Sequence, residues 1–141
     1  MSEERALSCP SAQPGMHNLR VIGVAQRGAD GVRVVYLNEI VEASEDVLAS
    51  TAPVHPTEVL RLAGDCRTDQ CVHFGGGRCH LAARVATMLP AVVEALPVCT
   101  IRSTCRWFAQ EGRDACLRCP QVVTECHDAA DDFVQVATPP A

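Results

Sequence analysis

The chain has 141 residues, of which 48% are hydrophobic and 4% are aromatic, and its formal net charge is −5. This length suits one domain of ordinary size, and the negative charge argues against a general nucleic-acid binder. Arginine supplies all of the basic residues. A chain without lysine cannot use a P-loop lysine on phosphates or form a Schiff base with pyridoxal phosphate.

The N-terminal residues do not resemble a secretory signal peptide, because Glu3 and Glu4 stand where a basic region is needed and no apolar run follows. No stretch approaches the roughly 20 apolar residues of a membrane span. We therefore expect a cytoplasmic protein without membrane contact, in a compartment where thiols stay reduced.

The first half of the chain predicts an arm followed by a β-hairpin. Pro10, Pro14 and Gly15 indicate that residues 1–17 form a flexible arm. Two runs of β-branched residues, 19–25 and 32–37, are separated by a glycine-containing turn, which is typical of a hairpin whose second strand can extend to Val41.

Short helices are expected after the hairpin. Ser44 can cap a helical turn at 45–49, and the apolar residues of 57–63 predict a short helix that Gly64 ends. Residues 18–63 are therefore predicted to be a β-hairpin plus a short helix.

Residues 64–127 form a cysteine-rich region with short predicted elements. Apolar residues recur at helical spacing from His80 to Leu89, where Pro90 stops the helix, and a helical turn is expected at 91–96. Residues 128–141 are expected to be a disordered tail. The predicted fold is small α+β, with an N-terminal β-hairpin region followed by a cysteine-rich, mainly short-helical metal-binding lobe.

Nine cysteines in a reducing compartment point to metal binding. Disulfides would need an oxidising environment, and the odd number would leave one thiol unpaired. Eight cysteines fall between residues 66 and 126, and these are the predicted metal ligands: Cys66, Cys71, Cys79, Cys99, Cys105, Cys116, Cys119 and Cys126.

Three assignments of these thiols are open. In chain order, Cys66, Cys71, Cys79 and Cys99 hold one metal group and the last four hold another. Alternatively, Cys66-x4-Cys71-x2-Phe74 and Cys99-x5-Cys105-x2-Phe108 form an internal repeat. Cys9 then joins the first unit and Cys99 serves the second. The third assignment is a single cluster with structural leftover thiols.

The spacing favours iron–sulfur over zinc. Structural zinc sites commonly use two Cys-x2–4-Cys hooks around one ion. Here one hook has two-residue spacing, Cys116–Cys119, and a looser one is Cys66–Cys71, while the other intervals are longer. A 4Fe-4S cluster takes its four thiolates at separate irons, so irregular spacing suits it. The fragment Cys116-x2-Cys119-Pro120 resembles a piece of bacterial ferredoxin motifs.

The zinc alternative rests on Cys116, Cys119, Cys126 and His127, which can form a mixed zinc knuckle. We expect His73, His80 and His127 to support ligands or lie at the surface rather than bind metal. Five arginines lie beside the cysteines, where they can offset the negative charge of thiolate-bound clusters or form a solvated basic face: Arg67, Arg78, Arg102, Arg106 and Arg118.

The sequence thus predicts an iron–sulfur protein with one or two 4Fe-4S clusters, acting in electron transport or as a redox accessory to a partner enzyme or protein. It shows no catalytic group of obvious identity, so we do not expect an enzyme. The acidic hairpin region is a candidate docking surface. The alternatives are a zinc-stabilised protein-interaction module and an enzyme that uses a cluster or the ninth thiol, Cys9, directly.

Overall fold

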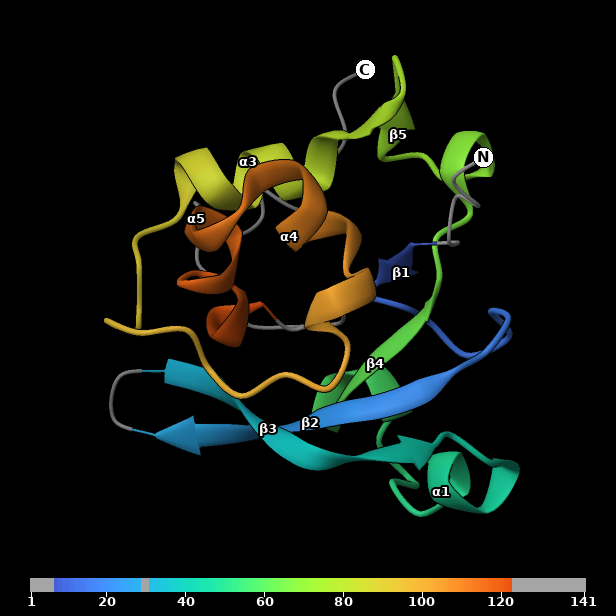
Figure 1. The fold of residues 1–141 in the computed structure, drawn as a ribbon. Coiled ribbons are helices and arrows are strands. Elements are labelled where there is room, and N and C mark those ends of the chain that lie inside the picture. The colour runs from blue at the N-terminus through green and yellow to red at the C-terminus, as the bar shows by residue number, and fades with distance from the viewer. Residues whose placement is uncertain (1–6, 29–30, 123–141) are drawn as a thin grey trace.

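A four-stranded antiparallel sheet in the order β1-β4-β2-β3 forms one layer of the computed structural model, which describes residues 7–28 and 31–122 (Figure 1). Its strands are β1 (Ser8–Cys9), β2 (Arg20–Gly28), β3 (Gly31–Glu42) and β4 (Leu60–Asp65). A second, two-stranded sheet pairs β5 (Phe74–Gly75) with β6 (Arg78–Cys79). The predicted small α+β class, with an antiparallel sheet and short helices, is confirmed.

The predicted hairpin is strands β2 and β3. Gly28 pairs with Gly31 at its turn and Val24 pairs with Val35 along its length. The register shifts between Val21 and Gly23, so the strand carries a bulge there. At this bulge, Gly23 is buried against the neighbouring strand β3.

The helix predicted for residues 57–63 is wrong beyond its first turn. Helix α2 covers only Pro56–Val59, and the chain continues directly as strand β4. Periodicity does not separate a helix from a strand in so short an apolar run. Strand pairing determines the conformation of this segment, because β4 lies between β1 and β2 in the sheet. It buries Leu62 and Ala63 completely, on opposite faces of the sheet.

Strand β1 lies within the segment that the sequence assigned to an arm. Ser8 pairs with Asp65 and Cys9 pairs with Gly64, at the edge of the sheet. Ala12, a few residues later, is fully buried and its backbone N–H donates to the carbonyl of Leu62. The segment therefore docks against the central strand β4.

Two of the predicted helices are present. Helix α1 (Glu45–Ala49) is capped by the Ser44 side chain, which accepts from the Val47 N–H, and α3 (His80–Met88) ends before Pro90. The helical turn expected at 91–96 is wrong, because that segment has no helical hydrogen bonds. It lies against the C-terminal helices instead, where the Val92 N–H donates to the Leu117 carbonyl.

The remaining elements are short, as expected for the cysteine-rich region. They are the α-helices α4 (Arg106–Glu111) and α5 (Arg113–Cys116) and the 3-10 turns η1 (Thr68–Gln70), η2 (Arg102–Thr104) and η3 (Cys119–Gln121). Within the described parts of the chain, no helix is both long and apolar enough to cross a membrane. The predicted tail at 128–141 lies outside the described residues.

The sheet has a different apolar cluster on each face. Helices α3, α4 and α5 cover one face (Figure 1), where Ile22 and Ala63 of the sheet pack with Trp107 and the helices. Val21 and Leu62 point to the other face and pack near α1. This alternation follows the two-residue period of β-strands, and it places every second side chain of β4 under the cysteine-rich region.

The buried glycine of the bulge gives a test of this packing. A Cβ at Gly23 would lie 2.6 Å from Val34 Cγ1 and 2.9 Å from the Val35 carbonyl oxygen. We expect Gly23→Ala to lower the free energy of unfolding by about 1–3 kcal/mol, as overpacking does, in urea unfolding followed by circular dichroism. Gly28→Ala is the matched control, since among the described residues its Cβ would meet only the Gly31 carbonyl oxygen, at 3.8 Å. Equal effects of the two substitutions would contradict the packing described.

Candidate functional site

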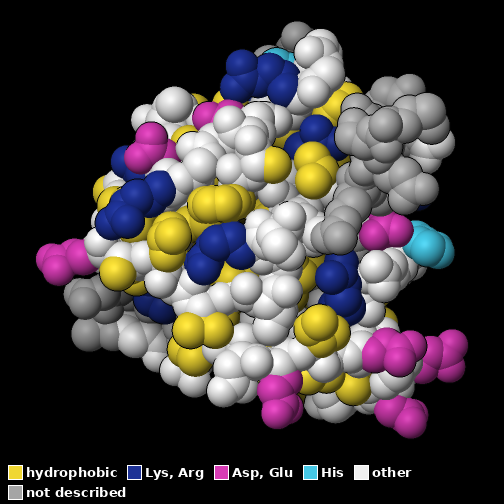
Figure 2. Space-filling model, in the orientation of Figure 1, with side chains coloured by type: hydrophobic (Ala, Val, Ile, Leu, Met, Phe, Trp, Pro, Cys, Tyr) yellow, Lys and Arg dark blue, Asp and Glu magenta, His cyan; other side chains and the backbone are white. Residues whose placement is uncertain are grey.

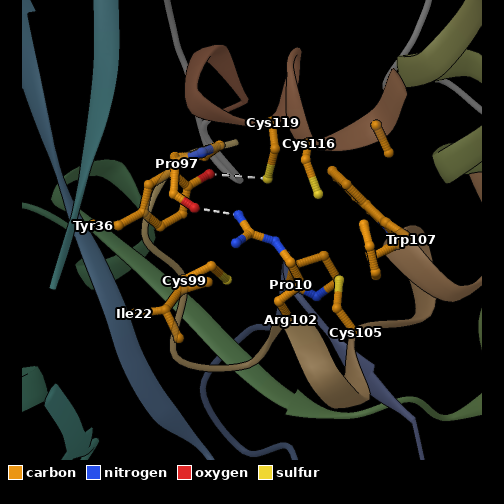
Figure 3. Close-up of a pocket in the computed structure, with 12 residues that line it drawn as sticks. Pro10, Ile22, Tyr36, Pro97, Cys99, Arg102, Cys105, Trp107, Cys116 and Cys119 are labelled. Carbon is orange, nitrogen blue, oxygen red and sulfur yellow. Dashed lines mark hydrogen bonds between the residues drawn. The ribbon is translucent and has the colours of Figure 1, made fainter. Parts of the chain in front are cut away.

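The eight described cysteines are free thiols, and they line two cavities in two groups of four. The first group, Cys9, Cys66, Cys71 and Cys79, lines a cavity of about 480 Å³. The second group, Cys99, Cys105, Cys116 and Cys119, lines a cavity of about 20 Å³ (Figure 3). Each group combines thiols from several short elements.

Backbone pairing and tight turns position the first group. Cys9 lies on β1, and the N–H of Cys66, which directly follows β4, donates to the Leu7 carbonyl at 2.8 Å. Cys71 follows the 3-10 turn η1. Cys79 ends the small β5–β6 hairpin, whose turn needs positive φ angles and is made by Gly76 and Gly77.

The second group is built from the C-terminal short helices. Cys105 directly precedes α4, Cys116 ends α5, and Cys119 begins η3. Cys99 comes from the irregular segment before η2. Figure 3 shows the four sulfurs around the guanidinium of Arg102, which forms a hydrogen bond with Cys116 and with the Pro97 carbonyl.

Burial makes five of the eight thiols hard to ionise in the metal-free protein. It raises the pKa of both Cys9 and Cys105 to about 12, and it raises the pKa of Cys79, Cys99 and Cys116. Members of the same group add to the increase: the pKa of Cys9 is raised by Cys66, Cys79 and Cys71. The pKa of Cys105 is raised by Cys119 and Cys99. The cysteines that raise the pKa of Cys9 and of Cys105 are thus members of the same cavity group in each case.

Backbone N–H groups oppose this effect by pointing at the sulfurs. The N–H of Ser11 lowers the pKa of Cys9, and the N–H of Phe108 lowers that of Cys105, against the larger effect of burial. Cys79 caps helix α3, with its sulfur 3.4 Å from the N–H of Ala82. Such donors stabilise a thiolate rather than a thiol, which is the form that binds metal.

The sequence did not reveal two side chains that contact Cys119. Tyr36 of β3 donates its hydroxyl to the Cys119 sulfur at 2.9 Å, and Arg61 of β4 donates Nη2 to the same sulfur at 3.0 Å. Burial raises the pKa of the Tyr36 hydroxyl. Burial would lower the pKa of the Arg61 guanidinium, but Cys119 and Tyr36 raise it above its usual value.

Arg61 has a signal in the sequence once β4 is known to be a strand. It lies between Leu60 and Leu62 in a run that is apolar on both sides, so a buried strand there must bury an arginine. Its side chain is 1% exposed. Tyr36 has no comparable signal, because nothing in the local pattern connects it to a cysteine 83 residues away.

Two further arginines place unpaired donors at the cavities. Arg102 lines the smaller cavity and Arg106 lines the larger one. The Nε atoms of both are buried and have no hydrogen-bond partner among the described residues. Because a buried donor without a partner is costly, both atoms fit an anionic group bound among the thiols.

The described residues contain no group of three or more Cys, His, Asp or Glu side chains that could hold a single metal ion. A tetrahedral zinc site needs every sulfur about 2.3 Å from one ion. An iron–sulfur cluster instead receives each thiolate at a different iron.

The predicted ligands are distributed differently from chain order. Seven of them line the two cavities, and Cys99 lies with the later cysteines instead of the earlier ones. Cys9 takes its place in the first group, which is the arrangement of the internal repeat. Cys126 and His127 lie outside the described residues, so the structure does not test the predicted zinc knuckle.

The other two histidines with predicted supporting roles have polar partners. Arg84 donates to His73 Nδ1 at 2.9 Å, and burial together with Arg84 lowers the pKa of His73. His80 Nε2 lies 3.0 Å from the Gly75 carbonyl oxygen. His73 lines the larger cavity, where its neutral form is favoured.

The raised thiol pKa values predict how the metal-free protein responds to alkali. The unfolded chain ionises these thiols near pH 9.0, whereas folded Cys9 and Cys105 ionise near pH 12. Their stabilising contribution is therefore complete below about pH 9 and is lost as the pH rises toward about 12. We expect the urea midpoint of the reduced, metal-free protein to fall over this range. The Cys9→Ala/Cys105→Ala protein should show a shallower fall, and an equal fall would contradict the assignment.

Comparisons with models of protein families, with curated proteins and with solved structures found no match to this chain. Its function is therefore inferred from the chemistry of the two cysteine groups.

Proposed function

We propose that this chain is an iron–sulfur protein that binds two 4Fe-4S clusters and transfers electrons to, or acts as a redox accessory of, a partner enzyme or protein. One observation carries the proposal: eight thiols from distant parts of the chain line two cavities, four to each. Four cysteine thiolates are the ligand set of a 4Fe-4S cluster.

The surroundings of the thiols support this ligand set. A thiolate-bound cluster is anionic, and arginine side chains compensate negative charge inside a protein. Arg106 at the larger cavity and Arg61 beside Cys119 of the smaller one are suitably placed. In the second group, a cluster requires the Arg102 guanidinium to leave the space that it occupies between the sulfurs.

Full thiolate ligation favours electron transfer over substrate chemistry. A bound cluster of this kind supplies a one-electron couple, and its irons have no open position when four thiolates hold it. The protein's part is to hold the thiolates, exclude water and set the local charge. Trp107, which is 2% exposed, lines both cavities and shields each of them from solvent.

An acidic surface supports docking to a redox partner. Exposed carboxylates gather where β3 leads into α1: Glu39, Glu42, Glu45 and Asp46. Figure 2 shows acidic side chains together at this lower end of the molecule. Such a surface speeds transient encounter with a partner that carries a basic patch.

Metal content gives the first test of the function. We expect protein purified and reconstituted without oxygen to contain about eight irons and about eight acid-labile sulfides per chain, since each cluster holds four of each. Its brown absorption should bleach with dithionite. A colourless protein that holds stoichiometric zinc, or that gains no iron, would contradict the proposal and favour the zinc-stabilised interaction module.

A matched pair of variants, Cys9→Ala and Cys126→Ala, tests which cysteines bind each cluster. If Cys9 belongs to the first group, Cys9→Ala should lose about half of the iron, the share of one cluster of two, and Cys126→Ala should retain all of it. The chain-order assignment predicts the reverse. Iron and sulfide analysis of both variants, prepared in parallel with the unaltered protein, distinguishes the two.

A further inference from the structure

Cys119 has an unusual environment for a cysteine that lines a cavity, because two side chains from the sheet contact its sulfur. The Tyr36 hydroxyl donates at 2.9 Å and the Arg61 guanidinium donates at 3.0 Å. Both donors lie on the side of the sheet that faces the helices, next to η3.

Arg61 carries a buried positive charge, and Cys119 Sγ is the side-chain atom that accepts a hydrogen bond from it. Its other hydrogen bonds go to the backbone carbonyls of Pro10, Cys119 and Val122. Among the described residues, no carboxylate pairs with it. A buried charge without compensation is strongly destabilising, so an anionic group bound beside Cys119 would compensate the guanidinium.

We propose that Tyr36 and Arg61 are positioning residues that raise the reduction potential of a cluster bound by the second cysteine group, acting through the sulfur of Cys119. This inference rests on the proposed function. Reduction adds negative charge that spreads onto the sulfur ligands. Donors and a cation at such a sulfur therefore stabilise the reduced state more than the oxidised state, which raises the potential.

The burial of Arg61 makes this effect substantial. Its side chain is fully enclosed, so water does not screen its charge from the sulfur. By contrast, the donors that reach Cys9 and Cys79 of the first group are backbone N–H groups, of Ser11 and of Leu81 and Ala82. The effect of the two sheet residues is thus directed at the second group.

Tyr36→Phe gives the cleaner test, because it keeps the aromatic ring and removes only the donor. Arg61 also holds three backbone carbonyls, so its replacement would disturb the fold. We expect the reduction equilibrium constant of one cluster to fall about five- to tenfold, where tenfold equals about 59 mV for a one-electron couple. The other cluster should keep its potential. Potentiometric titration followed by electron paramagnetic resonance measures both, and Cys9→Ala identifies the signal of the second group.

Ser8→Ala is the matched control. Its hydroxyl lies beside both groups, where it meets Thr104 Oγ1 at 3.0 Å and accepts from Arg20, and these contacts involve no sulfur. This variant should leave both potentials unchanged. If Tyr36→Phe keeps its iron and neither potential moves, or both move equally, the inference is overturned while the proposed function stands. If the unaltered protein takes up no iron, the proposed function itself has failed.

Discussion

The buried guanidinium of Arg61 is the interaction on which the rest of the structure depends. It projects from the central strand β4 toward the helices, and it holds together segments that are distant in the chain: Pro10 near the N-terminus and Cys119 and Val122 at the end of the described residues. Its guanidinium carbon also lies 5.4 Å from the centre of the Trp107 ring. The same charged side chain therefore connects the sheet to the helical layer and contacts the sulfur of Cys119. Packing of the fold and the position of this cysteine thus depend on one residue.

The elements that carry the two cysteine groups contact each other directly. Ser8, next to Cys9, forms a backbone bridge with Cys105, so this contact joins the neighbour of a first-group cysteine directly to a second-group cysteine. The Gln110 side chain clamps the backbone of Cys79, with N–H donors in both directions at 2.7 Å. Contacts of this kind connect α4 of the second group to the hairpin of the first.

Local signals in the sequence predicted the elements whose formation is local. The hairpin, the Ser44-capped helix α1 and helix α3 before Pro90 are set by turn residues, a cap and a proline. Strand β4 was missed because a short apolar run takes its conformation from its neighbours in the sheet. The cysteines pointed to a metal site, but the contact of Cys119 with Tyr36 and Arg61 depends on tertiary packing, which no local pattern encodes.

The strand β1 gives the two groups unequal routes of assembly. The second group closes within a segment of about 20 residues, whereas the first must bring Cys9 across about 57 residues to Cys66, at a larger entropic cost of loop closure. The N-terminal segment contributes only a two-residue strand to the sheet. The first group is therefore complete only while β1 stays paired with β4, since Cys9 is its one member from the N-terminal segment.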